Sequence, residues 1–349
     1  MQKIGRSFNI RGIFLPSLVL ILCSSRWLGL AVGALSPARA LEYLKNSGAG
    51  QGIVSAENPF AGFSFDSFFK EDTAPVSAQA ENYHPAYTVV EEFMASAESD
   101  IVLKKEYCYL KNLTHLSRPQ VKSVMLQPLP FSVEKNSGKP QILIYHTHAT
   151  ESYVPTRDMA YDSSYAYRST DCSRNMTAVG KVMADTLNNL GYNTIQDITL
   201  HDYPSYNGSY DLSKATVEKY LEKYPSIKIV LDVHRDAVER NGRLINPVAA
   251  INGAKYAQIM IISGRDNGYM NMPNYLENLK FATNLQNRLG KSYPGLARPI
   301  LFDYRNYNQQ LTTGSLLVEV GTHGSTLQQA KNSAAAFATA LAQLLDEMQ

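Results

Sequence analysis

Three clusters of polar residues each follow a short hydrophobic segment of this 349-residue chain. His148 and Glu151 lie in HTHATESY directly after ILIY, His234 ends IKIVLDVH, and Glu319 lies in LLVEVGTHG. Two imidazoles and one carboxylate form an open zinc ligand set in hydrolytic enzymes and leave a fourth position for water. Such a zinc ion polarises a carbonyl group and lowers the pKa of its bound water. We therefore predict a zinc site formed by His148, Glu151 and His234.

Glu319 is the predicted acid and base of this site. Metal-assisted hydrolysis needs a group that moves protons, which is usually a carboxylate, and Glu319 ends a predicted strand next to a glycine turn. Each cluster alone is weak evidence, because H-x-x-E often arises by chance and a single glutamate is more often an ion-pair partner. The position of all three clusters at strand ends is what favours a metal site.

Four other residues are possible secondary members of the site. His146 is the alternative to His148 as the first ligand, but His148 lies further past the strand and completes the H-x-x-E spacing. Asp232 or Asp236 could hold the far ring nitrogen of the histidine between them, as carboxylates do for zinc-bound histidines. Arg235 belongs to the same DVHRD segment.

Alternating hydrophobic runs and amphipathic segments indicate the elements that must position these residues. Strands are predicted at 141–145, 192–196, 227–233, 246–251, 256–263, 299–303 and 315–321. Helices are predicted at 175–191, 213–224, 273–290 and 325–348. This alternation is typical of a three-layer α/β/α domain with a mainly parallel sheet. In such sheets the chemistry lies beyond the carboxyl ends of the strands.

Composition divides the chain into three parts. Residues 1–40 are predicted to be a signal peptide or membrane anchor, and residues 139–349 the catalytic domain. The stretch between them, 41–138, begins with a Gly-, Ser-, Ala- and Asn-rich tether and is interpreted as a linker and small N-terminal region. Within it, VVEEFMASAES (89–99) is a possible helix.

The N-terminus predicts export from the cytoplasm. Basic residues precede an apolar stretch over 13–35, and Ala38-Arg39-Ala40 follows as a small-x-small pattern. A cleaved signal peptide fits this pattern, and an uncleaved anchor fits the length of the stretch. Arg26 counts against the anchor, because an arginine at the centre of a membrane helix costs roughly 2.5–3.5 kcal/mol on insertion scales.

Several function classes are disfavoured. The net charge of +2 and the absence of a Lys/Arg-rich block argue against nucleic-acid binding. No C-x-x-C pair suggests a thiolate metal site or a redox dithiol, and no G-x-S-x-G elbow or glycine-rich phosphate loop occurs. Twenty-two tyrosines suit a cleft for a saccharide or peptide polymer, although half-buried tyrosines in an α/β domain are an equally good explanation.

Four motifs in order resemble the stage II sporulation protein P family of endospore-forming bacteria: ILIYHTHATESY, HDYPSYNGSY, KIVLDVHRDA and LLVEVGTHGSTLQQA. The resemblance covers about residues 139–349. It implies a domain similar to zinc N-acetylmuramoyl-L-alanine amidases, which would cut peptidoglycan during engulfment and also cleave cross-links as an endopeptidase. It further implies work at the engulfing membrane with stage II sporulation proteins D and M.

The resemblance also leaves alternatives open. In typical wall amidases the glutamate ligand lies later in the chain than Glu151 does here, which makes Asp171 the alternative second ligand. A zinc peptidase that acts only within stem peptides would use the same metal chemistry. A cell-wall-binding scaffold with a degenerate site is the alternative from a different class, although the complete set of candidate ligands counts against it.

Overall fold

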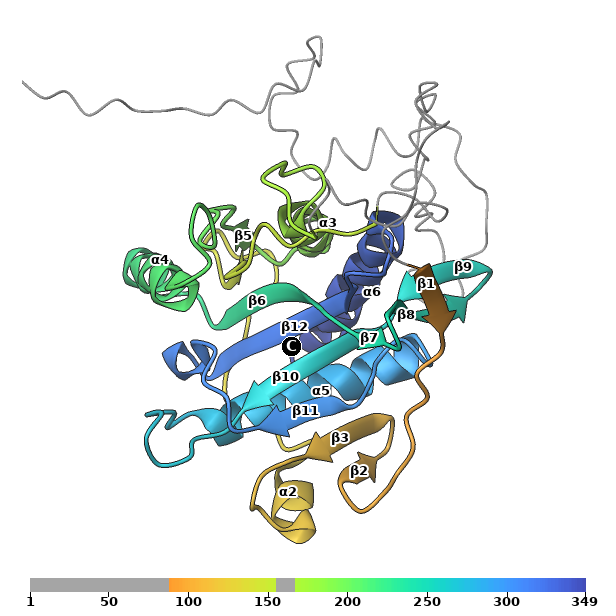
Figure 1. The fold of residues 1–349 in the computed structure, drawn as a ribbon. Helices are drawn as coiled ribbons and strands as arrows, with labels where there is room; N and C mark the ends of the chain where they lie inside the picture. The colour runs from red at the N-terminus through yellow and green to blue at the C-terminus, as the bar shows by residue number, and fades with distance from the viewer. Residues whose placement is uncertain (1–87, 155–166) are drawn as a thin grey trace, which may run out of the picture. The chain divides into compact units, whose positions relative to one another are not determined.

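The computed structural model describes residues 88–154 and 167–349, which are arranged around a large β-sheet (Figure 1). The signal peptide or anchor expected over 1–40 lies outside these described residues, as does the tether that follows it. Within the described ranges, no helix has the length and hydropathy needed to cross a bilayer.

The large sheet has eight strands. In spatial order they are β2 (Val102–Lys105), β3 (Cys108–Asn112), β11 (Ile300–Asp303), β10 (Ile259–Gly264), β12 (Gly314–Thr322), β6 (Ile229–Asp236), β4 (Ile142–Tyr145) and β5 (Thr194–Gln196). The pairs β2–β3 and β10–β12 are antiparallel, and the other five neighbouring pairs are parallel. The prediction of a mainly parallel sheet is confirmed.

Helices cover both faces of this sheet, as strand β6 shows. Leu231 and Val233 belong to the main core, which they share with α3 (Met176–Asn189), α5 (Tyr275–Ser292) and α6 (Leu327–Asp346). Val230 belongs instead to a cluster with Val217 of α4 (Ser209–Lys223). Because successive side chains of a strand point to opposite faces, α4 covers the face opposite to the other three helices. The predicted three-layer α/β/α architecture is confirmed.

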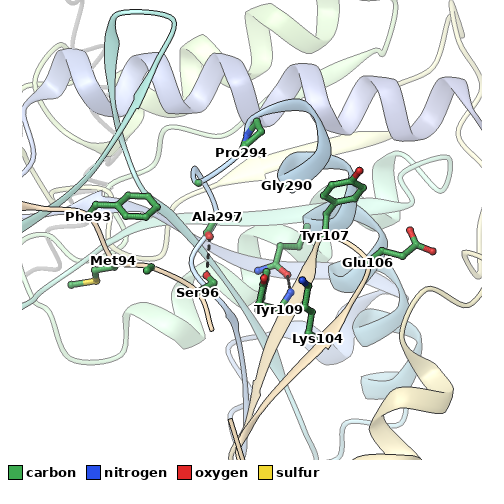
Figure 2. A pocket seen from close by; sticks show the side chains of 13 residues that line it. Phe93, Met94, Ser96, Lys104, Glu106, Tyr107, Tyr109, Gly290, Pro294 and Ala297 are labelled. Carbon is green, nitrogen blue, oxygen red and sulfur yellow. Dashed lines mark hydrogen bonds between the residues drawn. The ribbon is translucent and has the colours of Figure 1, made fainter. Parts of the chain in front are cut away.

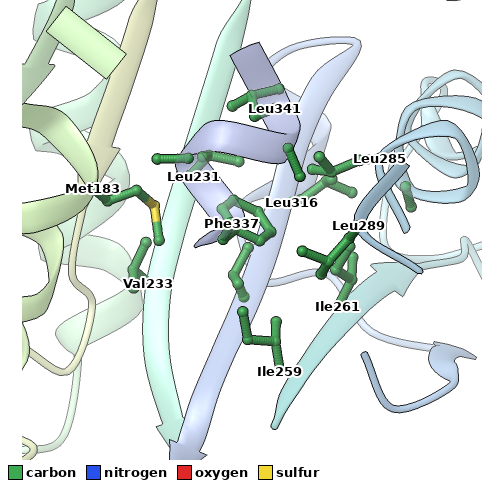
Figure 3. Close-up of a cluster of buried hydrophobic side chains, with 14 of the residues drawn as sticks. Met183, Leu231, Val233, Ile259, Ile261, Leu285, Leu289, Leu316, Phe337 and Leu341 are labelled. Carbon is green, nitrogen blue, oxygen red and sulfur yellow. The ribbon is translucent and has the colours of Figure 1, made fainter. Parts of the chain in front are cut away.

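The alanine-rich helix α6 packs closely on the centre of the sheet. Figure 3 shows Phe337 of α6 over Leu231 of β6 and Leu316 of β12, with Leu285 of α5 beside them. Phe337 is fully buried, and burial of such a side chain contributes roughly 1.5–3 kcal/mol. This core fixes the relative positions of the two strands that supply most of the polar site residues.

The sheet extends N-terminally past residue 139, where the catalytic domain was predicted to begin. Strand β3 pairs with β11 in parallel, and Leu103, Leu110 and Val121 of β2, β3 and α2 (Arg118–Val124) are buried in the main core. The hairpin β2–β3 and the end of α5 also enclose a cavity of about 340 Å³, lined by Phe93, Tyr107, Tyr109 and Pro294 among others (Figure 2). Its lining shares no residue with the three polar clusters.

The helix predicted over 89–99 is wrong. The structure has strand β1 (Thr88–Glu92), which pairs in parallel with β8 (Arg243–Ile251) in a second sheet that also contains β7 (Glu239–Arg240) and β9 (Ala254–Ala257). Val89 and Val90 are β-branched and suit a strand, and β8 provides hydrogen-bond partners for their backbone. Pairing with β8, which lies far along the chain, therefore makes residues 88–92 a strand.

Candidate functional site

Strand register places Asp232, His234 and Glu319 on one face of the sheet. Because Leu231 and Val233 point into the main core, Asp232 and His234 point to the face covered by α4. Strand β12 runs parallel to β6, and Glu319 is the direct register partner of His234. Residues 85 positions apart in the chain therefore lie on neighbouring strands, with their side chains on the same side.

His148 and Glu151 reach the same place from the segment after β4, which pairs with β6 on its other side. The ring of His148 meets that of His234 edge-to-face, with centroids 5.2 Å apart. Glu151 Oε2 lies 3.7 Å from Nδ1 of His234 and accepts a hydrogen bond from the backbone N–H of Arg235 at 3.1 Å. The structure thus places His148 and Glu151 each beside His234.

Asp232 holds the other nitrogen of His234. Its Oδ1 lies 2.8 Å from His234 Nε2, and the carboxylate is itself fixed by the backbone N–H and the hydroxyl of Thr147. Burial lowers the pKa of His234, but the charges of Asp232 and Glu151 outweigh it and raise the pKa to about 9. Nε2 therefore faces Asp232, and Nδ1 is left facing Glu151.

His148 lies beneath the N-terminal end of α4. It stacks on Tyr206, with centroids 4.5 Å apart, and its Nδ1 lies 3.4 Å from the hydroxyl of Ser209. Burial and then the positive charge of His234 lower the pKa of His148 to about 4. His148 is consequently neutral near pH 7, which is the form that binds a metal ion.

The carboxyl group of Glu319 is buried with few polar contacts. Its Oε2 is out of contact with solvent and has no hydrogen-bond partner among the described residues. Burial is the main cause that raises its pKa to about 8, with the positive charge of His234 acting in the opposite direction. A carboxyl group that titrates near neutrality suits a proton-transfer role.

The sequence reading missed a buried support behind the ligands. Asp202 accepts hydrogen bonds from the backbone N–H and hydroxyl of Thr150 and from Arg168. Arg168 also lies 3.7 Å from Glu151 Oε1 and over the ring of Tyr206. Asp202 and Tyr206 lie in the motif HDYPSYNGSY, but nothing in the spacing of this motif indicates their contacts with Arg168.

His146 is part of the fold and not of the cluster. It is fully buried, its Nδ1–H donates to the carbonyl of Val233 at 2.8 Å, and its Nε2 accepts from Gln196 at 3.0 Å. Both ring nitrogens are therefore already used. Burial lowers the pKa of His146 to about 4, so the ring is neutral and this pattern of one donor and one acceptor is satisfied.

Gly180 of α3 leaves the space in which His146 lies, so we expect Gly180→Ala to destabilise the chain. A methyl group there would lie 2.5 Å from the His146 ring and 2.6 Å from Gln196 Nε2. Overpacking of this kind costs about 1–3 kcal/mol, or several degrees in melting temperature for a domain of this size. Gly138→Ala is the control, because nothing lies within 4 Å of its methyl position. Equal melting temperatures for both variants would contradict the expectation.

The remaining sequence candidates lie around the cluster. Arg235 donates from Nε to the carbonyl of Ser152 at 2.9 Å, so its side chain braces the loop. Asp236 pairs with Arg298 at 2.9 Å, and Asp232, not Asp236, holds His234. Asp171 is exposed and accepts hydrogen bonds from Ser173 instead of joining the histidines.

Within residues 88–154 and 167–349, no group of three or more His, Cys, Asp and Glu side chains is arranged to hold a metal ion. The candidate donors meet in pairs, His148 with His234 and Glu151 with His234.

Comparison with known proteins points to one family. The family described as Stage II sporulation protein P (SpoIIP) matches residues 52–342 of this chain. Stage II sporulation protein P of Bacillus subtilis (strain 168) is 29% identical over 244 residues, which are 67% of this chain and 58% of that protein. The match therefore spans little more than half the length of that relative.

Several solved structures with a similar course of the backbone are amidases. They include N-acetylmuramoyl-L-alanine amidase AmiC2 of Nostoc punctiforme (15% identity, 61% of this chain and 98% of that chain, TM-score 0.35). The amidase Ami1 of Mycobacterium smegmatis is another (13% identity, 61% of this chain and 100% of that chain, TM-score 0.37). The CwlD amidase of Clostridioides difficile, solved in complex with the GerS lipoprotein, is a third (11% identity, 59% of this chain and 97% of that chain, TM-score 0.36).

Proposed function

Since this chain belongs to the stage II sporulation protein P family, we propose that it is a zinc-dependent peptidoglycan hydrolase that acts outside the cytoplasm in sporulation engulfment. Its reaction is hydrolysis of the amide between the muramic acid lactyl group and L-alanine. One observation carries the proposal: Glu319 is the register partner of His234 on the neighbouring strand, and His148 and Glu151, from the segment after the adjacent strand β4, each lie beside His234.

The chemistry of these side chains fits zinc. Two imidazoles and a carboxylate match the ligands of catalytic zinc sites, and the Asp232–His234 contact matches the carboxylate that commonly orients a zinc-bound histidine. When bound, zinc would polarise the scissile carbonyl and acidify a water molecule. His234 is protonated near pH 7 because its pKa is about 9, so the ion must displace that proton and should bind less tightly at lower pH.

Glu319 would move the proton. As the water oxygen forms a bond to the carbonyl carbon, the ionised form of Glu319 takes a proton from that water, and the π electrons of the carbonyl move onto the carbonyl oxygen. Glu319 then gives the proton to the amide nitrogen as the carbon–nitrogen bond breaks. The products are the lactyl carboxylic acid and the free amine of the stem peptide.

Aromatic side chains would form the wall of the substrate cleft. Tyr206 stacks on His148 and is 56% exposed, and Tyr210 stacks on Tyr307 with centroids 5.3 Å apart. Tyrosine rings beside a catalytic group suit the flat faces of sugars and peptide bonds.

Mass spectrometry of digested peptidoglycan tests the proposed function. We expect the purified chain to release free stem peptides from peptidoglycan, and we expect a zinc chelator to stop the release. Shortened, formerly cross-linked peptides without free stem peptides would assign an endopeptidase instead. Binding of peptidoglycan without any product would favour the scaffold.

We further propose that the chain is attached to the membrane by residues 1–40, in the company of stage II sporulation proteins D and M. About 20 apolar residues suffice to span a bilayer, and the stretch over 13–35 has this length. In its native host, the chain should sediment with membranes and become soluble when residues 1–40 are removed. A soluble mature form that begins at Leu41 would favour a cleaved signal peptide.

A further inference from the structure

The ring of Tyr210 lies beside two of the candidate ligands, His148 and His234. It lies edge-on to His148 at 5.5 Å and parallel to His234 at 6.5 Å, measured between centroids. Tyr307 stacks on it from another direction. The planes of Tyr210 and His234 differ by 11°. The ring is therefore packed against both imidazole rings and against Tyr307.

The backbone of Tyr210 is fixed as firmly as its ring. Tyr210 is the second residue of α4, after Ser209. Gly208, which precedes the helix, adopts a φ of +84°. The carbonyl of Tyr210 accepts hydrogen bonds from Asn308 at 2.9 Å and Ser213 at 3.2 Å. A side chain anchored in this way is pre-organised, because it loses little freedom when it forms one more hydrogen bond.

The hydroxyl of Tyr210 remains protonated near pH 7. An ordinary tyrosine hydroxyl has a pKa of about 10 and therefore carries its proton at neutral pH. The neighbouring arginines are already used: Arg235 donates to backbone carbonyls, and Arg168 donates to Asp202. Tyr210 therefore supplies an O–H donor beside the site.

We propose that the Tyr210 hydroxyl donates a hydrogen bond to the oxyanion that forms on the scissile carbonyl during hydrolysis. The proton stays on Tyr210, and no bond to the tyrosine forms or breaks. A donor that meets its acceptor only after the carbonyl carbon becomes tetrahedral stabilises the transition state more than the substrate, so it raises kcat more than it lowers KM. This inference rests on the proposed amide hydrolysis.

Tyr210→Phe keeps the ring and removes the donor. We expect kcat on a soluble muropeptide to fall about 10²–10³-fold with KM, zinc content and melting temperature nearly unchanged. A phosphinate analogue, in which tetrahedral phosphorus replaces the scissile carbonyl carbon, should bind about 10²-fold more weakly by calorimetry. The free stem peptide should bind as it does to the unmodified chain.

Tyr220→Phe is the matched control on the same helix, because its hydroxyl bonds Asp197 and it has no place in the site. Unchanged kcat and unchanged phosphinate affinity in Tyr210→Phe would overturn the inference. The inference would also be overturned if kcat fell in Tyr210→Ala but not in Tyr210→Phe, because the ring would then act only by packing. If the unmodified chain releases no stem peptide, the proposed function itself fails. This outcome is distinct from the two results for the Tyr210 variants.

Discussion

Changing Glu319 to Gln should lower the release of stem peptides by about 10²–10⁴-fold while the chain keeps its zinc and its fold. The amide has the size of the carboxyl group but cannot take a proton from water and return it to the leaving amine. Its introduction should not destabilise the chain, because Oε2 of Glu319 has no hydrogen-bond partner to lose among the described residues. Muropeptide release, zinc content and melting temperature should be measured on the same preparation.

The three measurements separate the possible roles of Glu319. A lower melting temperature with activity reduced only in proportion to unfolding would indicate a structural ion pair. A stable variant without zinc would make Glu319 a ligand and Glu151 the better candidate for the general base. Glu218→Gln is the control, since Glu218 is exposed on α4 and lies 3.8 Å from Lys214.

The same change should alter how the stability of the zinc-free chain depends on pH. The folded chain holds the Glu319 proton more tightly than the unfolded chain does, because burial raises the pKa from 4.5 to about 8. Between these pH values the unfolded chain loses this proton while the folded chain keeps it, so the free energy of unfolding falls as the pH rises. Glu319→Gln lacks this loss, so its melting temperature relative to the unmodified chain should rise from pH 4.5 to 8. A pH-independent difference would contradict this expectation.

Changing His148 or His234 to Ala should remove most of the zinc, which we expect at about one ion per unmodified chain. An open site has only three protein ligands, and two donors are too few for tight binding. Asp232→Asn should have a smaller effect, about 10–100-fold in affinity, because Asp232 only orients His234. Metal content by plasma emission and competition with a chelator would measure this series.

His146→Gln is the matched control for the histidine changes. Because both nitrogens of His146 are used within the fold, this variant should keep its zinc and lose thermal stability. Full zinc occupancy in the His148 and His234 variants would refute the site. Loss of zinc in the His146 variant alone would move the first ligand to His146.

The sequence by itself determined the architecture and where on it chemistry could lie. Strands β4, β6 and β12 appear as short apolar runs because both of their faces are buried, and the polar residues that follow each run are visible as motifs. The carboxyl ends of neighbouring parallel strands meet at one edge, so gathering of these motifs could be predicted without knowing their distances. The predicted set of His148, Glu151, His234 and Glu319 came from this rule.

Only the tertiary structure decided which side chains meet. The register of Glu319 opposite His234 depends on pairing between strands far apart in the chain, and a shift of one residue would have turned Glu319 into the core. The choice of Asp232 over Asp236 depended on their contacts, because both share the face of His234: Asp232 Oδ1 lies 2.8 Å from His234 Nε2, whereas Asp236 pairs with Arg298. Tyr210 was missed because α4 begins at Ser209, where a left-handed glycine allows the turn, and not at the predicted Ser213. Such contacts depend on packing between distant segments, which no local pattern of residues encodes.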